Sequence, residues 1–273
     1  MQTVYLLGAD DPEMRAMEKL LIRARKTIVY ATSNGDRVSP GSAYQADPIL
    51  DLEPGYTLVR VECEPVSVQE GVKVVVIDHH RPGDPGFDMG PEKFWEASSL
   101  GQLHQLLNVK PSDWRKMIAA MDHCLSAAIR GECPGVSGSE VILVAVMEIA
   151  KSTSTGQIRV IQQIHDFAKL LKKSPHVVIG GQEVKDLRSI HLGKGYSRDL
   201  LTAQFAAAMG GHAVLLRHRN NYGLFDKCSI TGHARPETIE VFMNEWAPAQ
   251  GFQNIYGVPR RGYGGGYLPH PAK

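Results

Sequence analysis

The sequence predicts an α/β protein in which a parallel sheet flanked by helices is followed by a smaller α+β domain. Short β-branched apolar segments alternate with amphipathic ones in the first half of the chain, as in strand–helix–strand units with right-handed crossovers. Acidic residues and histidines follow several of these segments, at the carboxyl ends where open α/β sheets bind their ligands. The 273 residues, 43% hydrophobic and 22% charged, suffice for one large or two medium domains.

The expected strands are set by apolar segments. Residues 3–7 predict the first strand, and Asp11 followed by Pro12 and Glu13 predicts a helix start, because an acidic N-cap and an early proline favour initiation. Further strands are expected at residues 27–31, 56–61 and 72–77. Residues 32–56, which are polar and contain glycine and proline, are a predicted loop.

Apolar residues at helical spacing dominate the middle of the chain. They predict helices over residues 94–107, 114–128, 141–149 and 158–173. The polar segment 151–157 is the expected domain boundary, since Ser, Thr and Gly favour flexible connections. We therefore predict an α/β domain, a linker with a connecting helix, and a C-terminal α+β domain, over residues 1–150, 151–175 and 176–273.

Charge and composition limit the classes of function. Thirty basic and twenty-nine acidic residues give a net charge of +1, so no global field favours nucleic acid binding, although a local basic groove fits the composition. Residues 1–10 lack the pattern of a signal peptide, and the longest apolar run is too short to span a bilayer. Four cysteines without a CxxC pair predict reduced thiols. We expect a cytoplasmic protein without a membrane segment.

The tripeptide Asp78-His79-His80 is the most informative motif. It ends the predicted strand 72–77 and precedes a loop rich in proline and glycine at residues 81–86. A carboxylate and two imidazoles suit Mn²⁺, Mg²⁺ or Zn²⁺. The alternative interpretation is an aspartate that caps the loop beside two exposed histidines.

Acidic residues also follow two other predicted strands. Asp10 and Asp11 follow the first strand, and Glu62 follows the third along the chain. Because carboxyl ends of parallel strands meet at one sheet edge, these carboxylates are expected near the tripeptide. This convergence exceeds what the stability of a sheet requires and predicts a functional site.

The C-terminal region offers candidate contacts to an anion. A glycine run lets the backbone approach a ligand closely, and arginines bind phosphate in a bidentate manner. The alternative interpretation of the glycine run is a frayed terminus, and that of His233 is a structural turn. The candidate ligand-binding residues are Arg260, Arg261, Gly264, Gly265, Gly266 and His233.

These motifs together resemble the DHH phosphoesterase family. The resemblance is carried by the tripeptide Asp78-His79-His80, the upstream acids, an acid in a later helix, the segment 97–99 (Ala-Ser-Ser) and the glycine-rich end. In that end, Gly264-Gly265-Gly266 followed by His270 is similar to the substrate-binding loop of the family's C-terminal domain. It implies a DHH-like domain with a C-terminal substrate-binding domain. It also implies a hydrolase that cleaves a phosphodiester or phosphoanhydride in a nucleotide or short single-stranded oligonucleotide, and one or two Mn²⁺ or Mg²⁺ ions. Because family members often dimerise, a homodimer is also expected.

The resemblance assigns roles to individual residues. It implies catalytic roles for Asp78, His79 and His80, and it implies metal ligation by Asp10, Asp11, Glu62, Asp78, His79 and Asp122. Two features depart from the family pattern: the first motif has adjacent acids and no histidine, and Glu62 replaces an aspartate. Two hypotheses therefore stay open. One is a metal-dependent phosphoesterase, and the other is a degenerate, non-catalytic DHH-like protein that binds a nucleotide or a protein partner and need not hold an ion.

Overall fold

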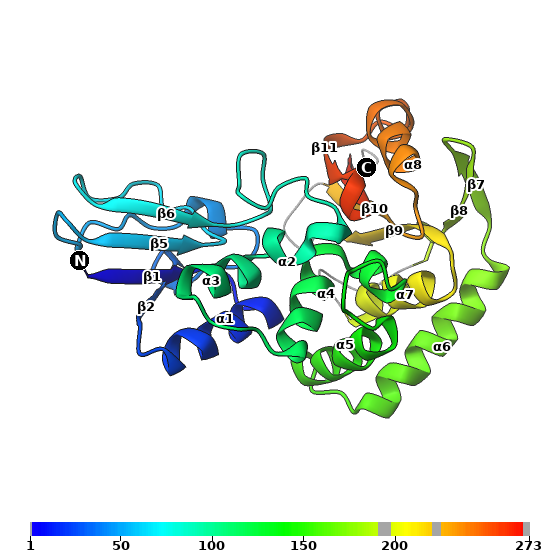
Figure 1. Cartoon of the computed structure of the whole chain (residues 1–273). Helices are drawn as coiled ribbons and strands as arrows, with labels where there is room; N and C mark the ends of the chain where they lie inside the picture. The colour runs from blue at the N-terminus through cyan, green and yellow to red at the C-terminus, as the bar shows by residue number, and fades with distance from the viewer. Residues whose placement is uncertain (1, 191–197, 220–224, 270–273) are drawn as a thin grey trace. The chain divides into compact units, whose positions relative to one another are not determined.

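The computed structural model describes most of the chain: residues 2–190, 198–219 and 225–269. The chain divides into two units, Met1–His123 and Cys124–Lys273, which we call unit 1 and unit 2 (Figure 1). Among the described residues, no helix has both the length and the apolar character that a membrane crossing requires.

The division falls inside helix α4 (Asp113–Ile129). Cys124 there has φ −154° and ψ 63°, which interrupts the helical backbone. The boundary expected at residues 151–157 lies instead within unit 2, between α5 (Gly138–Ser152) and α6 (Gln157–Lys173). The polar residues of that segment therefore form a short turn between two helices, for which the same small and polar residues are suited.

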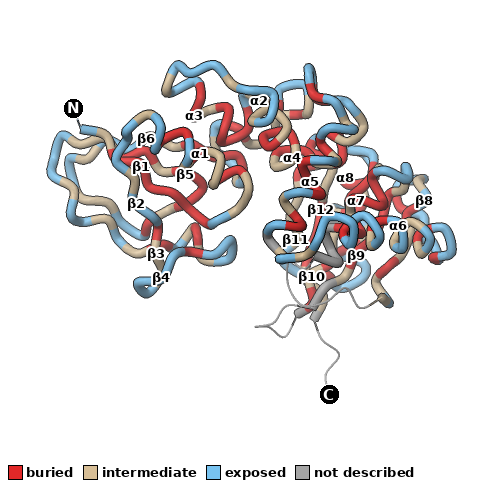
Figure 2. The backbone as a smooth tube through the Cα atoms, turned by 90° about the horizontal axis from the view of Figure 1, so that it is seen from below, coloured by how far each residue is buried: buried red, intermediate tan, exposed pale blue. Residues whose placement is uncertain are grey.

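Unit 1 contains a four-stranded parallel sheet with the strand order β2-β1-β5-β6. Its strands are β1 (Thr3–Leu7), β2 (Thr27–Tyr30), β5 (Thr57–Val61) and β6 (Lys73–Ile77). All four were predicted from their apolar segments. The central strands β1 and β5 are mostly buried, whereas the edge strand β2 is mostly exposed (Figure 2).

The two faces of this sheet are covered differently. Helices α1 (Pro12–Arg23) and α3 (Ser99–Leu107) lie on one face (Figure 1). On the other face, Leu6 and Leu58 pack in a buried cluster with residues of the predicted loop, among them Ala43. That loop contains three short elements: β3 (Thr32–Ser33), β4 (Asp36–Arg37) and the 3₁₀ turn η1 (Ala43–Gln45).

The single helix expected over residues 94–107 is broken into two. A 3₁₀ turn, η2 (Pro91–Lys93), leads into α2 (Phe94–Ala97), and Ser98 then leaves the helical region at ψ 147°. The Ser98 hydroxyl accepts a hydrogen bond from the Gly101 amide at 3.1 Å and so caps α3. Apolar spacing continues across the break, so the pattern alone could not reveal it.

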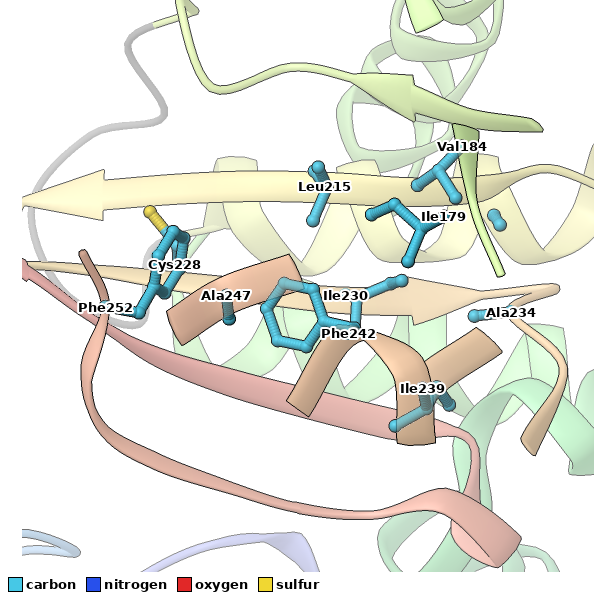
Figure 3. Close-up of a cluster of buried hydrophobic side chains, with 11 residues drawn as sticks. Ile179, Val184, Leu215, Cys228, Ile230, Ala234, Ile239, Phe242, Ala247 and Phe252 are labelled. Carbon is cyan, nitrogen blue, oxygen red and sulfur yellow. The ribbon is translucent and has the colours of Figure 1, made fainter. Parts of the chain in front are cut away.

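Unit 2 is built on a six-stranded mixed sheet with the order β11-β12-β10-β9-β8-β7, in which only β8 and β9 pair in parallel among the described strands. Its strands are β7 (His176–Ile179), β8 (Gln182–Asp186), β9 (Ala213–Arg219), β10 (Phe225–Gly232), β11 (Gln253–Val258) and β12 (Tyr263–Pro269). Besides α5 and α6, its helical segments are α7 (Arg198–Met209), α8 (Pro236–Val241), η3 (Phe242–Trp246), α9 (Ala247–Ala249) and η4 (Pro259–Arg261). Figure 3 shows Phe242 and Ile230 in the buried cluster of this unit.

Candidate metal centre

Four side chains converge at the carboxyl edge of the sheet in unit 1. Glu13, Glu62, His79 and Asp122 each place one ligand atom within 4.8 Å of the other three. His79 Nε2 lies 3.1 Å from Asp122 Oδ2 and 3.8 Å from Glu62 Oε1. The four residues come from the start of α1, the ends of β5 and β6, and α4. We call these four residues the carboxylate–histidine cluster.

The cluster is buried and rich in negative charge. Glu13 and His79 are fully buried, and Glu62 is 6% exposed. Glu13 Oε2 and Glu62 Oε1 have no hydrogen-bond donor among the described residues while both groups are ionised, and a proton on one carboxyl group would bond Glu13 to Glu62. Burial and the charges of Asp122 and Glu62 raise the pKa of Glu13 well above its usual range. Buried carboxylates in such proximity call for a proton or a cation between them, and this donor set suits a divalent ion such as Mn²⁺.

Asp78 and His80 lie beside the cluster and are hydrogen-bonded to one another. Asp78 Oδ1 accepts hydrogen bonds from the His79 and His80 amides at 2.7 and 3.1 Å, and it lies 2.9 Å from His80 Nδ1. The Tyr44 hydroxyl donates to Asp78 Oδ2 at 3.0 Å. Partial burial lowers the pKa of His80, but the hydrogen bond to Asp78 and the charge of Glu62 outweigh this effect and raise the pKa to about 9. Asp78 thus orients the ring of His80 and holds the backbone of both histidines through its hydrogen bonds.

Of the two adjacent acids after β1, Asp11 faces the cluster. Its side chain caps α1, and burial together with the charges of Glu62 and Asp122 raises its pKa. Asp10 is 52% exposed and pairs with Arg15 at 3.2 Å. The structure therefore leaves Asp10 outside the carboxylate–histidine cluster, because its side chain is turned toward the surface of α1.

Sequence reasoning did not predict Glu13 as part of this site. It was interpreted only as a first-turn acid of α1, which helix ends commonly carry. A signal was nevertheless present in the spacing. Glu13 lies four residues before Met17 and seven before Leu20, on the buried stripe of the helix. An acid on an apolar stripe is unusual for a packing position and points to a partner in the interior.

His123 was also missed as a site residue. Its Nδ1 lies 2.9 Å from His79 Nδ1, and its Nε2 lies 2.9 Å from the carbonyl oxygen of Met89. The ring planes are inclined by only 27° and the ring centroids are 5.1 Å apart, so the two imidazoles meet edge to edge through these nitrogens. The sequence places His123 directly after Asp122, but nothing in the spacing indicates that both residues reach the same imidazole.

The predicted glycine-rich substrate loop is part of a strand. Gly264, Gly265 and Gly266 all belong to β12 in unit 2. A Cβ atom added at Gly265 would lie 2.5 Å from Tyr256 Oη, and one at Gly266 would lie 3.0 Å from Phe252 Cδ1. The described packing therefore accounts for at least two of these glycines without a ligand, because no side chain fits between the strand and its aromatic neighbours.

The other predicted substrate-binding residues differ in exposure and position. Arg260 is exposed, whereas Arg261 is 4% exposed, so the two side chains do not form one exposed phosphate clamp. His233 follows β10 in a turn, and burial lowers its pKa. His270 lies outside the described residues.

Comparison with known proteins gives weak structural similarity to solved structures. No family model matches the chain, and no curated protein matches its sequence. Among solved structures, the chain is similar to a pGpG-specific phosphodiesterase, PggH from Vibrio cholerae. The two share 12% sequence identity over 98% of this chain and 92% of that chain, with a TM-score of 0.42. These values assign neither a family nor an activity to this chain.

Proposed function

We propose that the protein is a metal-dependent phosphoesterase that hydrolyses a phosphodiester or phosphoanhydride bond in a nucleotide or a short single-stranded oligonucleotide. The observation that carries this proposal is the carboxylate–histidine cluster, in which Glu13 and Glu62 are buried close together and need a proton or a cation between them. The resemblance of Asp78-His79-His80 to the DHH motif supports the same chemistry.

Each residue of the cluster has a role in this proposal. Glu13, Glu62, His79 and Asp122 would hold one or two Mn²⁺ or Mg²⁺ ions, with Asp11 next to them. A bound divalent ion lowers the pKa of its water and neutralises charge on phosphoryl oxygens. The three carboxylates of the cluster also neutralise the charge of the ion itself, so that it can be held in a buried place.

His80 is the residue best placed to meet the substrate. Its side chain is 41% exposed, whereas that of His79 is fully buried. Asp78 holds the ring at Nδ1, which leaves Nε2 for a hydrogen bond to a phosphoryl or leaving-group oxygen. Asp78 itself is held by Tyr44, so the ring of His80 is oriented before a substrate arrives.

Calorimetric titration with Mn²⁺ tests the metal site. Wild type is expected to bind Mn²⁺, and His79→Ala and Asp122→Asn are expected to abolish or strongly weaken binding. Asp10→Asn is the matched control, because it removes a neighbouring acid that lies outside the cluster. Absence of Mn²⁺ binding by wild type at millimolar concentration would contradict the proposal.

Hydrolysis assays then distinguish a phosphoesterase from the degenerate, non-catalytic protein. A linear dinucleotide, a cyclic dinucleotide, a short single-stranded oligonucleotide and inorganic pyrophosphate should be offered with and without Mn²⁺. Metal-dependent cleavage of one of them, lost in His80→Ala, is the expected result. Metal binding without cleavage of any substrate would favour the degenerate, non-catalytic protein that the altered first motif also suggests.

A further inference from the structure

We propose that His123 is a positioning residue that fixes which ring nitrogen of His79 carries the proton, and thereby keeps His79 Nε2 available to a divalent cation. The proposal rests on the metal site of the proposed function. It assigns a role to a residue that belongs neither to the DHH tripeptide nor to the carboxylate–histidine cluster.

The chain of contacts starts at a backbone carbonyl. Met89 O lies 2.9 Å from His123 Nε2, and a carbonyl oxygen can only accept a hydrogen bond. His123 Nε2 must therefore carry a proton in this contact. In a neutral imidazole the other nitrogen is then without a proton, so Nδ1 of His123 is an acceptor.

This tautomer determines the state of the next ring. His123 Nδ1 lies 2.9 Å from His79 Nδ1, and one of the two nitrogens must donate. Since neutral His123 accepts there, His79 Nδ1 carries the proton, and the lone pair of His79 is left on Nε2. Of the neutral forms of the pair, this one alone satisfies both hydrogen bonds. Neutral imidazole binds metals through the nitrogen that lacks the proton.

The arrangement directs that lone pair at the cluster. His79 Nε2 lies 3.1 Å from Asp122 Oδ2 and 3.8 Å from Glu62 Oε1. A lone pair that faces two carboxylates without a cation is electrostatically unfavourable, whereas a divalent ion turns the same geometry into a ligand set. Asp122 and His123 are consecutive on α4, so one helical turn supplies both a ligand and the residue that sets the tautomer.

Burial protects the hydrogen bond between His79 and His123 from water. His79 and His123 are 0% and 1% exposed, so water has little access to replace either hydrogen bond. Met89 lies in the segment that connects the DHH tripeptide to η2. This segment therefore contributes to the site through a backbone carbonyl. An acceptor at the position of His123 Nδ1 is the feature that the role requires.

Two substitutions of His123 separate this role from simple packing. His123→Asn keeps an oxygen acceptor near the position of Nδ1, whereas His123→Leu has none, and both lose the contact to Met89. His123→Leu is expected to weaken Mn²⁺ binding about 10–100-fold, the range found when partners of metal-binding histidines are removed. His123→Asn is expected to bind clearly more tightly than His123→Leu. His104→Leu, which removes a buried histidine of α3 outside the cluster, is the control for loss of packing.

Nitrogen-15 NMR of the imidazole rings identifies the tautomer of His79 without an activity assay. At alkaline pH in the metal-free protein, and with Zn²⁺ as a diamagnetic probe, His79 is expected to be the Nδ1–H tautomer. In His123→Leu this preference should be lost. Equal Mn²⁺ affinity of His123→Leu and wild type, or an Nε2–H tautomer in wild type, would overturn the proposal. If wild type binds no metal at all, the proposed function fails, and the tautomer in the metal-free protein still decides the role of His123.

Discussion

At the scale of single residues, the cluster stores unfavourable energy in the metal-free protein. Glu13 and Glu62 are both buried, and burial raises the pKa of each. Buried carboxylates of like charge near one another oppose folding unless a proton or a cation intervenes. Residues selected for stability alone would not be arranged in this way, so the arrangement favours a binding role over a structural one.

Glu13→Gln is expected to separate these two effects. The amide nitrogen of the glutamine can donate toward Glu62, while its oxygen can keep the 3.0 Å hydrogen bond from the Leu100 amide. We expect the free energy of unfolding of the metal-free protein to rise by roughly 1–3 kcal/mol, the cost of an unsatisfied buried polar group. We expect Mn²⁺ affinity to fall. Urea unfolding and calorimetry measure the two quantities, with Glu18→Gln on the same helix as the control.

Tyr44 is a second residue whose role is local and testable. Its hydroxyl donates to both oxygens of Asp78, and the guanidinium of Arg81 lies 3.9 Å from its ring centroid. Tyr44→Phe keeps the ring and removes the donor. We expect a loss of roughly 1–3 kcal/mol in the free energy of unfolding, since the partner is charged, together with slower hydrolysis.

Tyr30→Phe is the matched control for Tyr44→Phe. The Tyr30 hydroxyl also bonds a carboxylate, that of Glu18, but this pair lies at the surface. Its removal is expected to change the free energy of unfolding by no more than about 0.5 kcal/mol. Equal losses in the two variants would show that burial of Asp78 adds nothing to the strength of the bond from Tyr44.

At the scale of elements, local patterns explain how much the sequence could predict. The four strands of the parallel sheet were predicted because each is a short apolar segment, and α1 was predicted because Asp11 and Pro12 mark its start. The break between α2 and α3 at Ser98 was not predicted, because the apolar spacing continues through it. The glycine run at residues 264–266 was expected to be a loop because composition cannot distinguish backbone freedom from close packing between strands.

The loop after the DHH tripeptide supplies an element-scale prediction through Gly86. A Cβ atom there would lie 1.9 Å from the carbonyl oxygen of Ala97 and 2.7 Å from His79 Cβ. Gly86→Ala must therefore displace the loop, the end of α2, or His79 itself. We expect a loss of about 1–3 kcal/mol in stability and weaker Mn²⁺ binding.

Gly41→Ala is the control for Gly86→Ala. Gly41 also lies in a loop of unit 1, but a Cβ there would meet nothing nearer than Ser39 Oγ at 3.8 Å. Its stability and metal affinity should match those of wild type. If Gly86→Ala behaves like Gly41→Ala, the loop does not constrain His79, and the position of the ring must be set by His123 and Asp122.

At the scale of the whole molecule, topology brings together residues that are far apart in the chain. Asp11, Glu62 and His79 follow three strands of one parallel sheet, so their meeting could be predicted from strand order. Glu13 and His123 could not be predicted in this way, because their role depends on which face of a helix is buried. The division of the chain at residues 123 and 124 was also hidden, since it falls within a helical pattern.

All four residues of the carboxylate–histidine cluster belong to unit 1, and this yields a prediction for the whole chain. A ligand that binds the folded state alone stabilises it by RT ln(1 + [L]/Kd), about 2.7 kcal/mol at a hundredfold excess over Kd. If the units open separately, Mn²⁺ should slow amide hydrogen exchange in β1, β5 and β6 and leave β9 and β10 of unit 2 nearly unchanged. Hydrogen exchange with mass spectrometry measures both, and His79→Ala should lose the effect. Equal protection of β9 and β10 would instead mean that the two units unfold as one cooperative body, because only shared opening can carry the binding energy of unit 1 into unit 2.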